Sequence, residues 1–254
     1  MTSEKIVNAC LIIIGNEILS GRTQDANLAY LAKGLNSVGI RLREVRVIPD
    51  VADTIVATVN ELRAKFDYVF TTGGIGPTHD DITSENVARA FGVKWVLDDE
   101  AKRRLAAGYK DASELNEARL RMAHVPEGAV LIDNPVSRAP GFQIGNVFVL
   151  AGVPRIMQAM FDGIKHRLQG GAPVLSRSVV CGLPEGILAE GLGKLQQRFE
   201  DLDIGSYPFY RRDGHGVALV LRGTDEARLG AAVDELKAMI RNLGDEPYEG
   251  DPPA

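Results

Sequence analysis

The sequence predicts an α/β protein, with a three-layer α/β/α domain around a mostly parallel sheet followed by a small α+β domain. Three observations support this prediction. Through the first two thirds of the 254 residues, apolar runs of strand length alternate with apolar patterns of helical spacing, as in βαβ units. A Gly-Gly-Ala-Pro stretch at residues 170–173 then has the composition of a linker. Beyond it, the order becomes strand, helix, strand, strand, helix.

The first domain is expected over residues 1–169. Residues 6–14 form a continuous β-branched apolar run that ends at Gly15, as a strand buried on both faces should. Asp25 is a candidate N-cap for the first long helix. In chain order, the expected strands are 6–14, 41–48, 68–72, 93–97, 130–132 and 141–150 (a hairpin turning at Gly145-Asn146), and the expected helices are 27–38, 53–66, 84–91, 156–168 and a helical excursion over 99–123 broken near 108–111.

The second domain is expected over residues 174–244, in the order β-α-β-β-α that makes a small two-layer α+β domain. The Asp213-Gly214 pair indicates a hairpin between its last two strands. Residues 245–254 are polar and proline-rich, and we expect a frayed tail there. The expected strands are 174–180, 204–211 and 217–222, and the expected helices are 185–199 and 225–243.

Composition excludes several classes of protein. The net charge of −5 argues against general affinity for nucleic acid or anionic lipid, so a basic cluster at Arg211, Arg212 and His215 is interpreted as a solvated hairpin tip. Cys10 and Cys181 have no CxxC partner, which indicates two buried thiols in a reducing compartment rather than a zinc site. The apolar N-terminal run is too short to span a bilayer and has no cleavage site. We therefore expect a cytoplasmic protein without a membrane partner.

Residues 71–83 read Thr-Thr-Gly-Gly-Ile-Gly-Pro-Thr-His-Asp-Asp-Ile-Thr, and residues 73–81 are called the glycine loop below. A glycine-rich turn between a strand and a helix lets backbone N–H groups approach an anion, and the hydroxyls of Thr72 and Thr78 add donors. Asp80 and Asp81 beside an anion site suit a divalent cation that bridges them to phosphate. The alternatives are a tight turn that needs glycine only for its φ angle, and a helix cap by either aspartate.

Ligands of open α/β sheets bind at the carboxyl ends of the strands, where Glu17 and Asp50 are expected to lie. Glu17 could bind a metal or a ribose hydroxyl, or be a solvated turn residue. Asp50 could share an ion with Asp81 or cap the following helix. Because neighbouring strands lie about 4.8 Å apart, we expect the carboxylates of Asp50 and Asp81 to face a common cleft. His79 is interpreted as solvent-exposed and Arg138 as a surface residue.

Five segments resemble, in the right order, the MoaB/MogA-like molybdopterin-binding domain of the competence/damage-inducible CinA-like family, over roughly residues 6–168. They are residues 73–83, Ile14-Gly15-Asn16-Glu17-Ile18-Leu19-Ser20-Gly21 with Asp25-Ala26-Asn27, Val45-Arg46-Val47-Ile48-Pro49-Asp50, Ala139-Pro140-Gly141-Phe142 and Leu150-Ala151-Gly152-Val153-Pro154. The sequence departs from the family at Ala151, where proline is usual, and at Ser137-Arg138, where small residues are usual. It has no counterpart of the C-terminal amidohydrolase-like domain common in CinA proteins.

The resemblance implies a molybdopterin-binding fold followed by a KH-like small domain. It also implies phosphoanhydride chemistry, in which Asp50 and Asp81 are catalytic and hold a divalent metal. In the adenylyltransferase branch, acidic residues matching these two are associated with catalysis, and the CinA-like branch is associated with metal-dependent ADP-ribose pyrophosphatase activity. The residues expected to bind the ligand are Gly15, Glu17, Thr72, Gly73, Gly74, Gly76, Pro77, Thr78, Asp80 and Gly152.

We therefore expect hydrolysis of a pyrophosphate bond in an ADP-ribose-like nucleotide, with a divalent metal such as Mg²⁺. One alternative is a protein that binds or adenylylates molybdopterin. Another is a ligand-sensing module without turnover, in which the small domain mediates oligomer contacts. The expected partners are a phosphate-containing small molecule and further copies of the chain in a homo-oligomer.

Overall fold

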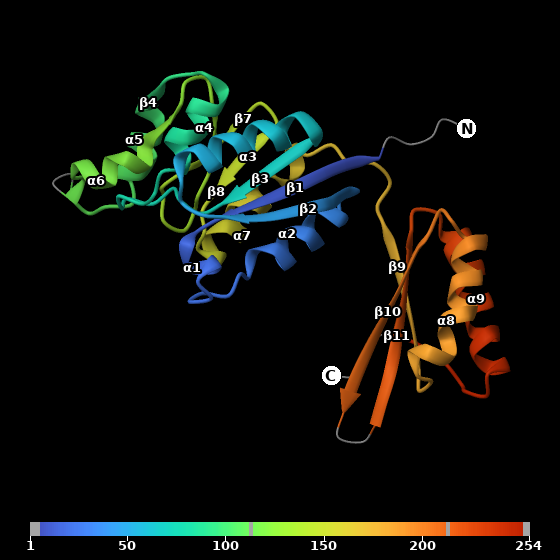
Figure 1. Cartoon of the computed structure of the whole chain (residues 1–254). Helices are drawn as coiled ribbons and strands as arrows, with labels where there is room; N and C mark the ends of the chain where they lie inside the picture. The colour runs from blue at the N-terminus through green and yellow to red at the C-terminus, as the bar shows by residue number, and fades with distance from the viewer. Residues whose placement is uncertain (1–5, 112–113, 212–213, 251–254) are drawn as a thin grey trace. The chain divides into compact units, whose positions relative to one another are not determined.

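The computed structural model describes residues 6–111, 114–211 and 214–250 (Figure 1). The chain forms two compact units, Met1–Gly171 and Ala172–Ala254, each with hydrophobic clusters of its own. The boundary between the units falls inside the Gly-Gly-Ala-Pro stretch. The first is called unit 1 and the second unit 2 below.

Unit 1 is built on a six-stranded, mostly parallel sheet. Its strands are β1 (Val7–Ile14), β2 (Ile40–Ile48), β3 (Tyr68–Thr72), β6 (Val130–Ile132), β7 (Gly141–Ile144) and β8 (Val147–Leu150), in the order β2-β1-β3-β8-β7-β6. The strands β2, β1, β3 and β8 are parallel, whereas β7 runs antiparallel to both of its neighbours. The continuous apolar run of β1 lies next to the middle of the sheet, where both faces of the strand are buried.

Helices cover both faces of this sheet (Figure 1). One face carries α2 (Asn27–Asn36) and α7 (Pro154–Ile164), whose Leu31, Leu35 and Phe161 pack against alternate residues of β1 and β3. The other face carries α3 (Ala52–Lys65) and α4 (Thr83–Phe91), which pack against the intervening residues of the same strands. The predicted three-layer α/β/α arrangement is confirmed. Unit 1 also contains α1 (Asn16–Leu19), which the sequence pattern did not indicate, and the 3-10 helix η3 (Lys165–Arg167), which directly follows α7.

The excursion after α4 forms a small lobe of α5 (Asp99–Ala106), α6 (Glu117–Leu120) and the 3-10 helix η2 (Arg121–Ala123), with strands β4 (Trp95–Leu97) and β5 (His124–Pro126). The expectation that residues 93–97 join the parallel sheet is wrong, because β4 pairs only with β5 in a separate antiparallel sheet. The indole nitrogen of Trp95 donates to Ser84 Oγ at 2.9 Å, and its ring lies 4.7 Å from that of His124. These contacts hold β4 against α4 instead of the main sheet.

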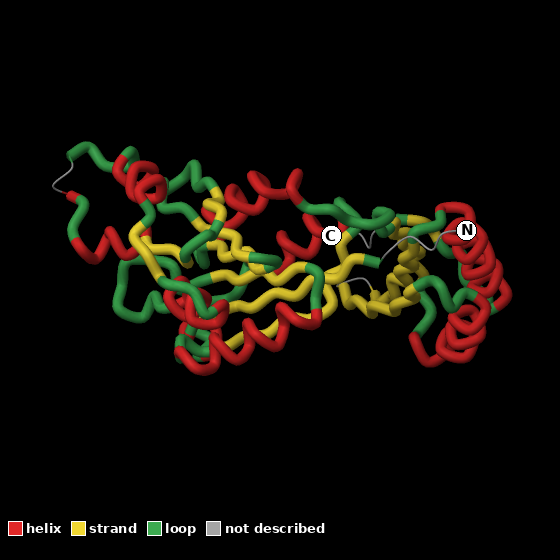
Figure 2. Tube along the Cα trace, turned by 90° about the horizontal axis from the view of Figure 1, so that it is seen from above, coloured by secondary structure: helices red, strands yellow, loops and turns green. Residues whose placement is uncertain are grey.

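Unit 2 consists of β9 (Leu175–Cys181), α8 (Glu185–Arg198), β10 (Asp203–Arg211), β11 (Gly214–Gly223), α9 (Glu226–Asn242) and β12 (Tyr248–Glu249). Its antiparallel sheet has the order β10-β11-β9-β12, and α8 and α9 lie on one face of it (Figures 1 and 2). The predicted small α+β domain is confirmed. Arg212 and Asp213 of the expected hairpin lie outside the described residues. No helix in the described ranges is long and apolar enough to cross a membrane.

The expected frayed tail departs from the structure at its first half. Tyr248 and Glu249 pair with Val180 and Val179 of β9 as a fourth strand. The carboxylate of Glu249 accepts a hydrogen bond from Arg177 at 2.6 Å and also pairs with Lys237. The polar, proline-rich composition predicted fraying. It does not reveal this pairing, because the partner residues are distant in the chain. Residues 251–254 lie outside the described part.

The two cysteines are free and buried, Cys10 in β1 and Cys181 in β9. Burial raises the pKa of the Cys10 thiol to about 12. Burial also raises the pKa of the Cys181 thiol. The thiolate is the nucleophilic form, so a raised pKa lowers the reactivity of both thiols at neutral pH.

Candidate functional site

The carboxyl ends of β1, β3 and β8 meet at one edge of the sheet, and a cavity of about 500 Å³ lies there. Its walls come from the glycine loop after β3, from α1 after β1, from the turn after β8, and from residues 134–139 between β6 and β7. Seven of the expected site residues line this cavity: Glu17, Gly73, Gly74, Gly76, Pro77, Asp81 and Gly152. Thr72 lines a smaller adjoining cavity of about 60 Å³.

The glycine loop needs glycine at its first two positions. Gly73 has φ +100° and Gly74 has φ +68°, which disfavour any residue with a Cβ atom. A Cβ at Gly73 would also lie 2.2 Å from the carbonyl oxygen of Ile14, so the loop passes directly over the end of β1. The N–H of Gly73 donates to Leu150 O at 3.2 Å, which fastens the loop to the end of β8. Gly73 therefore shapes the loop, and its amide is not available to a ligand.

Three amides of the glycine loop remain available. Within the described residues, the N–H groups of Gly74, Ile75 and Gly76 donate no hydrogen bond, although the carbonyl of Gly74 accepts one from Thr83 N at 2.9 Å. Consecutive free amides of this kind form a concave anion-binding site. The sequence predicted that the amides of residues 73–76 hold phosphate, and this range includes the amide of Ile75.

The acidic end of the loop is bonded to Thr78. Asp81 Oδ2 accepts hydrogen bonds from Thr78 N at 2.8 Å and from Thr78 Oγ1 at 2.5 Å. The same hydroxyl lies 2.5 Å from Asp80 Oδ1, and because it has one proton it donates to one carboxylate at a time. The hydrogen bond from Thr78 lowers the pKa of Asp80. Neither aspartate caps α4, which begins after Ile82 without a side-chain cap.

Asp50 is placed differently from the sequence expectation. The expectation that β2 and β3 are neighbours is wrong, because β1 lies between them and separates their ends by two strand spacings, about 10 Å. Asp50 Oδ2 accepts a hydrogen bond from Asn16 N at 2.9 Å, so it holds the start of α1 rather than capping α3. Burial raises the pKa of Asp50, and the nearby carboxylates of Glu17 and Asp80 raise it further. Asp50 does not line the large cavity.

Glu17, rather than Asp50, lines the large cavity. It projects from α1 into the large cavity together with Asp81. Its carboxylate folds back over Gly15, whose N–H donates to Ile48 O at 3.1 Å. The lining of the cavity includes these two carboxylates and no lysine, arginine or histidine. The lining of the large cavity therefore combines free amide donors with two carboxylates.

The donor set has the chemistry of a hard-cation site, since Mg²⁺ prefers carboxylate oxygens. Within the described ranges, no group of three or more His, Cys, Asp or Glu side chains is placed to hold a metal ion. Protein sites for Mg²⁺ commonly supply one or two carboxylates, and phosphate oxygens and water complete the shell. Glu17 and Asp81 supply carboxylates of this kind to the cavity lining.

The wall opposite the glycine loop depends on Asn134, which sequence reasoning missed. This side chain is 1% exposed, and its Nδ2 donates to Ser137 Oγ and to Ala139 O, both at 2.7 Å. Its Oδ1 accepts from Ser137 N at 3.1 Å. Ser137 and Ala139 are thereby held in the cavity wall, whereas Arg138 is exposed with φ +67°. The Asn-Pro pair before the Ala-Pro-Gly turn is the only sequence signal for this arrangement.

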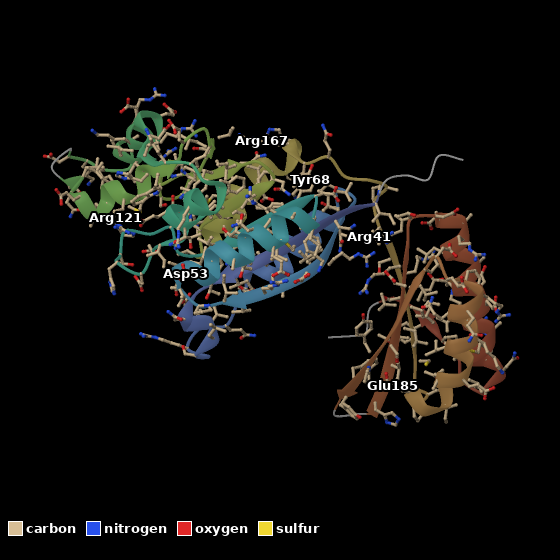
Figure 3. The ribbon with its side chains drawn as sticks, turned by 45° about the horizontal axis from the view of Figure 1, so that its top comes forward. Arg41, Asp53, Tyr68, Arg121, Arg167 and Glu185 are labelled. Carbon is tan, nitrogen blue, oxygen red and sulfur yellow. The ribbon has the colours of Figure 1, made fainter. Side chains whose placement is uncertain are left out.

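The glycine loop also forms a small pocket with residues of the small lobe. Gly76 and Asp81 also line a pocket of about 10 Å³ with Trp95, His124 and Arg121, the last labelled in Figure 3. The guanidinium carbon of Arg121 lies 5.6 Å from the Trp95 ring centroid. The expected solvent exposure of His79 agrees with the structure, and His79 lines none of these cavities.

Comparison with known proteins gives consistent matches over both units. Residues 10–170 match a family described as "Probable molybdopterin binding domain", and residues 173–245 match "FAD synthase, middle domain". A protein of Archaeoglobus fulgidus is 34% identical over 232 residues, covering 91% of this chain and 97% of that protein. A CinA-like protein of Desulfosudis oleivorans is 38% identical over 192 residues, which are 71% of this chain and 46% of that protein. The crystal structure of CinA, of unknown function, from Thermoplasma acidophilum aligns with a TM-score of 0.60 and 35% identity, over 63% of this chain and 96% of that one.

Proposed function

Since the chain belongs to the MoaB/MogA-like family of molybdopterin-binding domains, in its CinA-like form, we propose that it hydrolyses the diphosphate bond of an ADP-ribose-like nucleotide with a divalent metal ion. One observation carries the proposal. The large cavity places the free amides of Gly74, Ile75 and Gly76 beside the carboxylates of Glu17 and Asp81, without a basic side chain in its lining.

The combination of anion-binding amides with two carboxylates supports the involvement of a cation. A diphosphate brings at least two negative charges to a wall that already has two. Like charges 4 Å apart repel by on the order of 4 kcal/mol at an effective dielectric constant of 20. A divalent cation between the diphosphate and the carboxylates of Glu17 and Asp81 would remove this repulsion. A neutral ligand would need no such cation, but it would leave the amides without an anion.

The residues of the site divide the work. The amides of Gly74, Ile75 and Gly76 hold phosphate oxygens in place, which supports in-line attack by water. Glu17 and Asp81 would hold the metal ion, which neutralises charge on the diphosphate when it is bound. Asp50 is a positioning residue, because it fixes the N-terminus of the helix that presents Glu17. Thr78 does the same for Asp81.

The second candidate is binding or adenylylation of molybdopterin, and the family description of residues 10–170 favours it. The phosphate of a pterin would use the same amides. The two candidates differ in the metal requirement for cleavage and in the products formed.

The test uses the full chain, stripped of metal with EDTA and then incubated with ADP-ribose and each of several divalent ions. We expect AMP and ribose 5-phosphate only when a divalent ion is present. In parallel, ATP and molybdopterin are supplied with the same ions, and formation of adenylylated pterin would favour the second candidate. Hydrolysis that persists without a divalent ion, or no hydrolysis with any ion, would contradict the proposed activity.

A further inference from the structure

A side chamber opens beside the large cavity, between the start of α2 and the ends of β1 and β3. Its volume is about 60 Å³, and its polar lining is Glu17, Thr23, Gln24, Asp25, Asn27 and Thr72. It shares Glu17, Thr23, Gly73, Gly152 and Pro154 with the large cavity, so the two adjoin. The chamber therefore has room for a group larger than a single water.

Two residues of the chamber lining, Asn27 and Thr72, each have a buried side-chain oxygen without a hydrogen-bond partner. Asn27 is 4% exposed and Thr72 is 1% exposed, and neither Asn27 Oδ1 nor Thr72 Oγ1 is bonded within the described residues. The orientation of the amide is set by its other end, because Asn27 Nδ2 donates to Gly152 O at 2.8 Å. A buried polar group left unpaired costs about 1–3 kcal/mol. Such groups persist where a ligand or water completes them.

The character of the lining selects the ligand group. Asn27 Oδ1 can only accept a hydrogen bond, and the two charged residues of the lining, Glu17 and Asp25, are carboxylates. The N-terminus of α2 does not reverse this sign, because Asp25 Oδ1 already accepts from Leu28 N at 2.9 Å. The two carboxylates repel a phosphate, although Thr23, Gln24 and Thr72 have donors. A group that carries O–H donors finds partners for both free oxygens.

We propose that the side chamber binds the hydroxyl groups of a sugar attached to the diphosphate, an inference that rests on the proposed function. A carboxylate is the usual partner of ribose hydroxyls in nucleotide sites, and Glu17 lines both the chamber and the large cavity. The ligand then lies with its phosphates on the amides of Gly74–Gly76 and its sugar toward Asn27 and Thr72. The chamber, rather than the glycine loop, selects the non-phosphate part of the substrate.

Thr72→Val tests this assignment, and the neighbouring strand residue supplies a matched control. Thr71 is also buried with an unpaired hydroxyl, but it faces the opposite side of β3 and lines none of the cavities described above. Both substitutions remove an unpaired hydroxyl at nearly constant volume, so both variants should melt at or above the wild-type temperature. Thr72→Ser keeps the hydroxyl and should retain binding.

The probes are α,β-methylene-ADP-ribose, which is not hydrolysed, and methylenediphosphonate, which has no sugar. By calorimetry with Mg²⁺, Thr72→Val should weaken binding of the nucleotide about five- to tenfold, the worth of one hydrogen bond, and leave the diphosphonate unaffected. Thr71→Val should change neither. Equal affinities of Thr72→Val and Thr71→Val for the nucleotide, or equal loss of both probes, would overturn the sugar site alone. Binding of the diphosphonate but not of the nucleotide by the wild-type protein would also overturn the sugar site alone. Binding of neither probe by the wild-type protein would overturn the proposed function as well.

Discussion

Exchanging Asp81 for asparagine separates a metal-binding role from a structural one. Asp81 Oδ2 accepts two hydrogen bonds from Thr78, and an asparagine oxygen in the same place can keep both as neutral bonds. A hydrogen bond to a charged group contributes about 1.5–3 kcal/mol and a neutral one about 1 kcal/mol, and exposure of this loop reduces the difference. We therefore expect Asp81→Asn to cost about 1 kcal/mol, a fall in melting temperature of about 2–4 °C.

Turnover should respond far more strongly than stability. If Asp81 holds the divalent ion, loss of its charge should lower kcat for ADP-ribose at least about 100-fold, which corresponds to about 2.7 kcal/mol of activation free energy. Asp80→Asn is the matched control, because Asp80 contacts the same Thr78 hydroxyl but does not line the cavity. The assay is kcat as a function of Mg²⁺ concentration for both variants. Turnover within threefold of wild type in Asp81→Asn, or an equal loss in Asp80→Asn, would refute the metal role of Asp81.

Two further predictions concern Asp50 and the division of the chain. The raised pKa of Asp50 means that its ionised form is disfavoured in the folded state, so this cost is present at neutral pH and disappears as the pH falls below the ordinary aspartate range. Asp50→Asn can still accept the hydrogen bond from Asn16 N. Without divalent ions, it should raise the melting temperature at neutral pH and have no effect below about pH 4. An equal gain at both pH values would show that the ionisation of Asp50 is not the cause. A truncated protein ending at Gly171 should fold and bind methylenediphosphonate like the full chain, because unit 1 contains hydrophobic core clusters of its own and every residue lining the large cavity. Circular dichroism and calorimetry check this, and a folded but non-binding protein would show that unit 2 contributes to the site.

The order of the elements and the existence of the glycine loop follow from the sequence alone. The buried strand β1 is visible as a β-branched run, and the amphipathic patterns locate α2, α3 and α7. Both signals are local, since they depend on which residues repeat every two or every 3.6 positions. The two glycines at the start of the loop are also a local requirement, because positive φ angles are set by the residue itself.

Which side chains lie together in the site is determined only by the tertiary structure. Adjacent strands in the sequence were expected to be neighbours, but β1 lies between β2 and β3, and Glu17 rather than Asp50 lines the large cavity with Asp81. The bonding of Asn27 to Gly152 joins residues 125 positions apart. The order of strands in a sheet is selected by how the helices of the whole domain bury its two faces. Strand order therefore depends on how distant segments pack together, and the local pattern of residues does not report that packing.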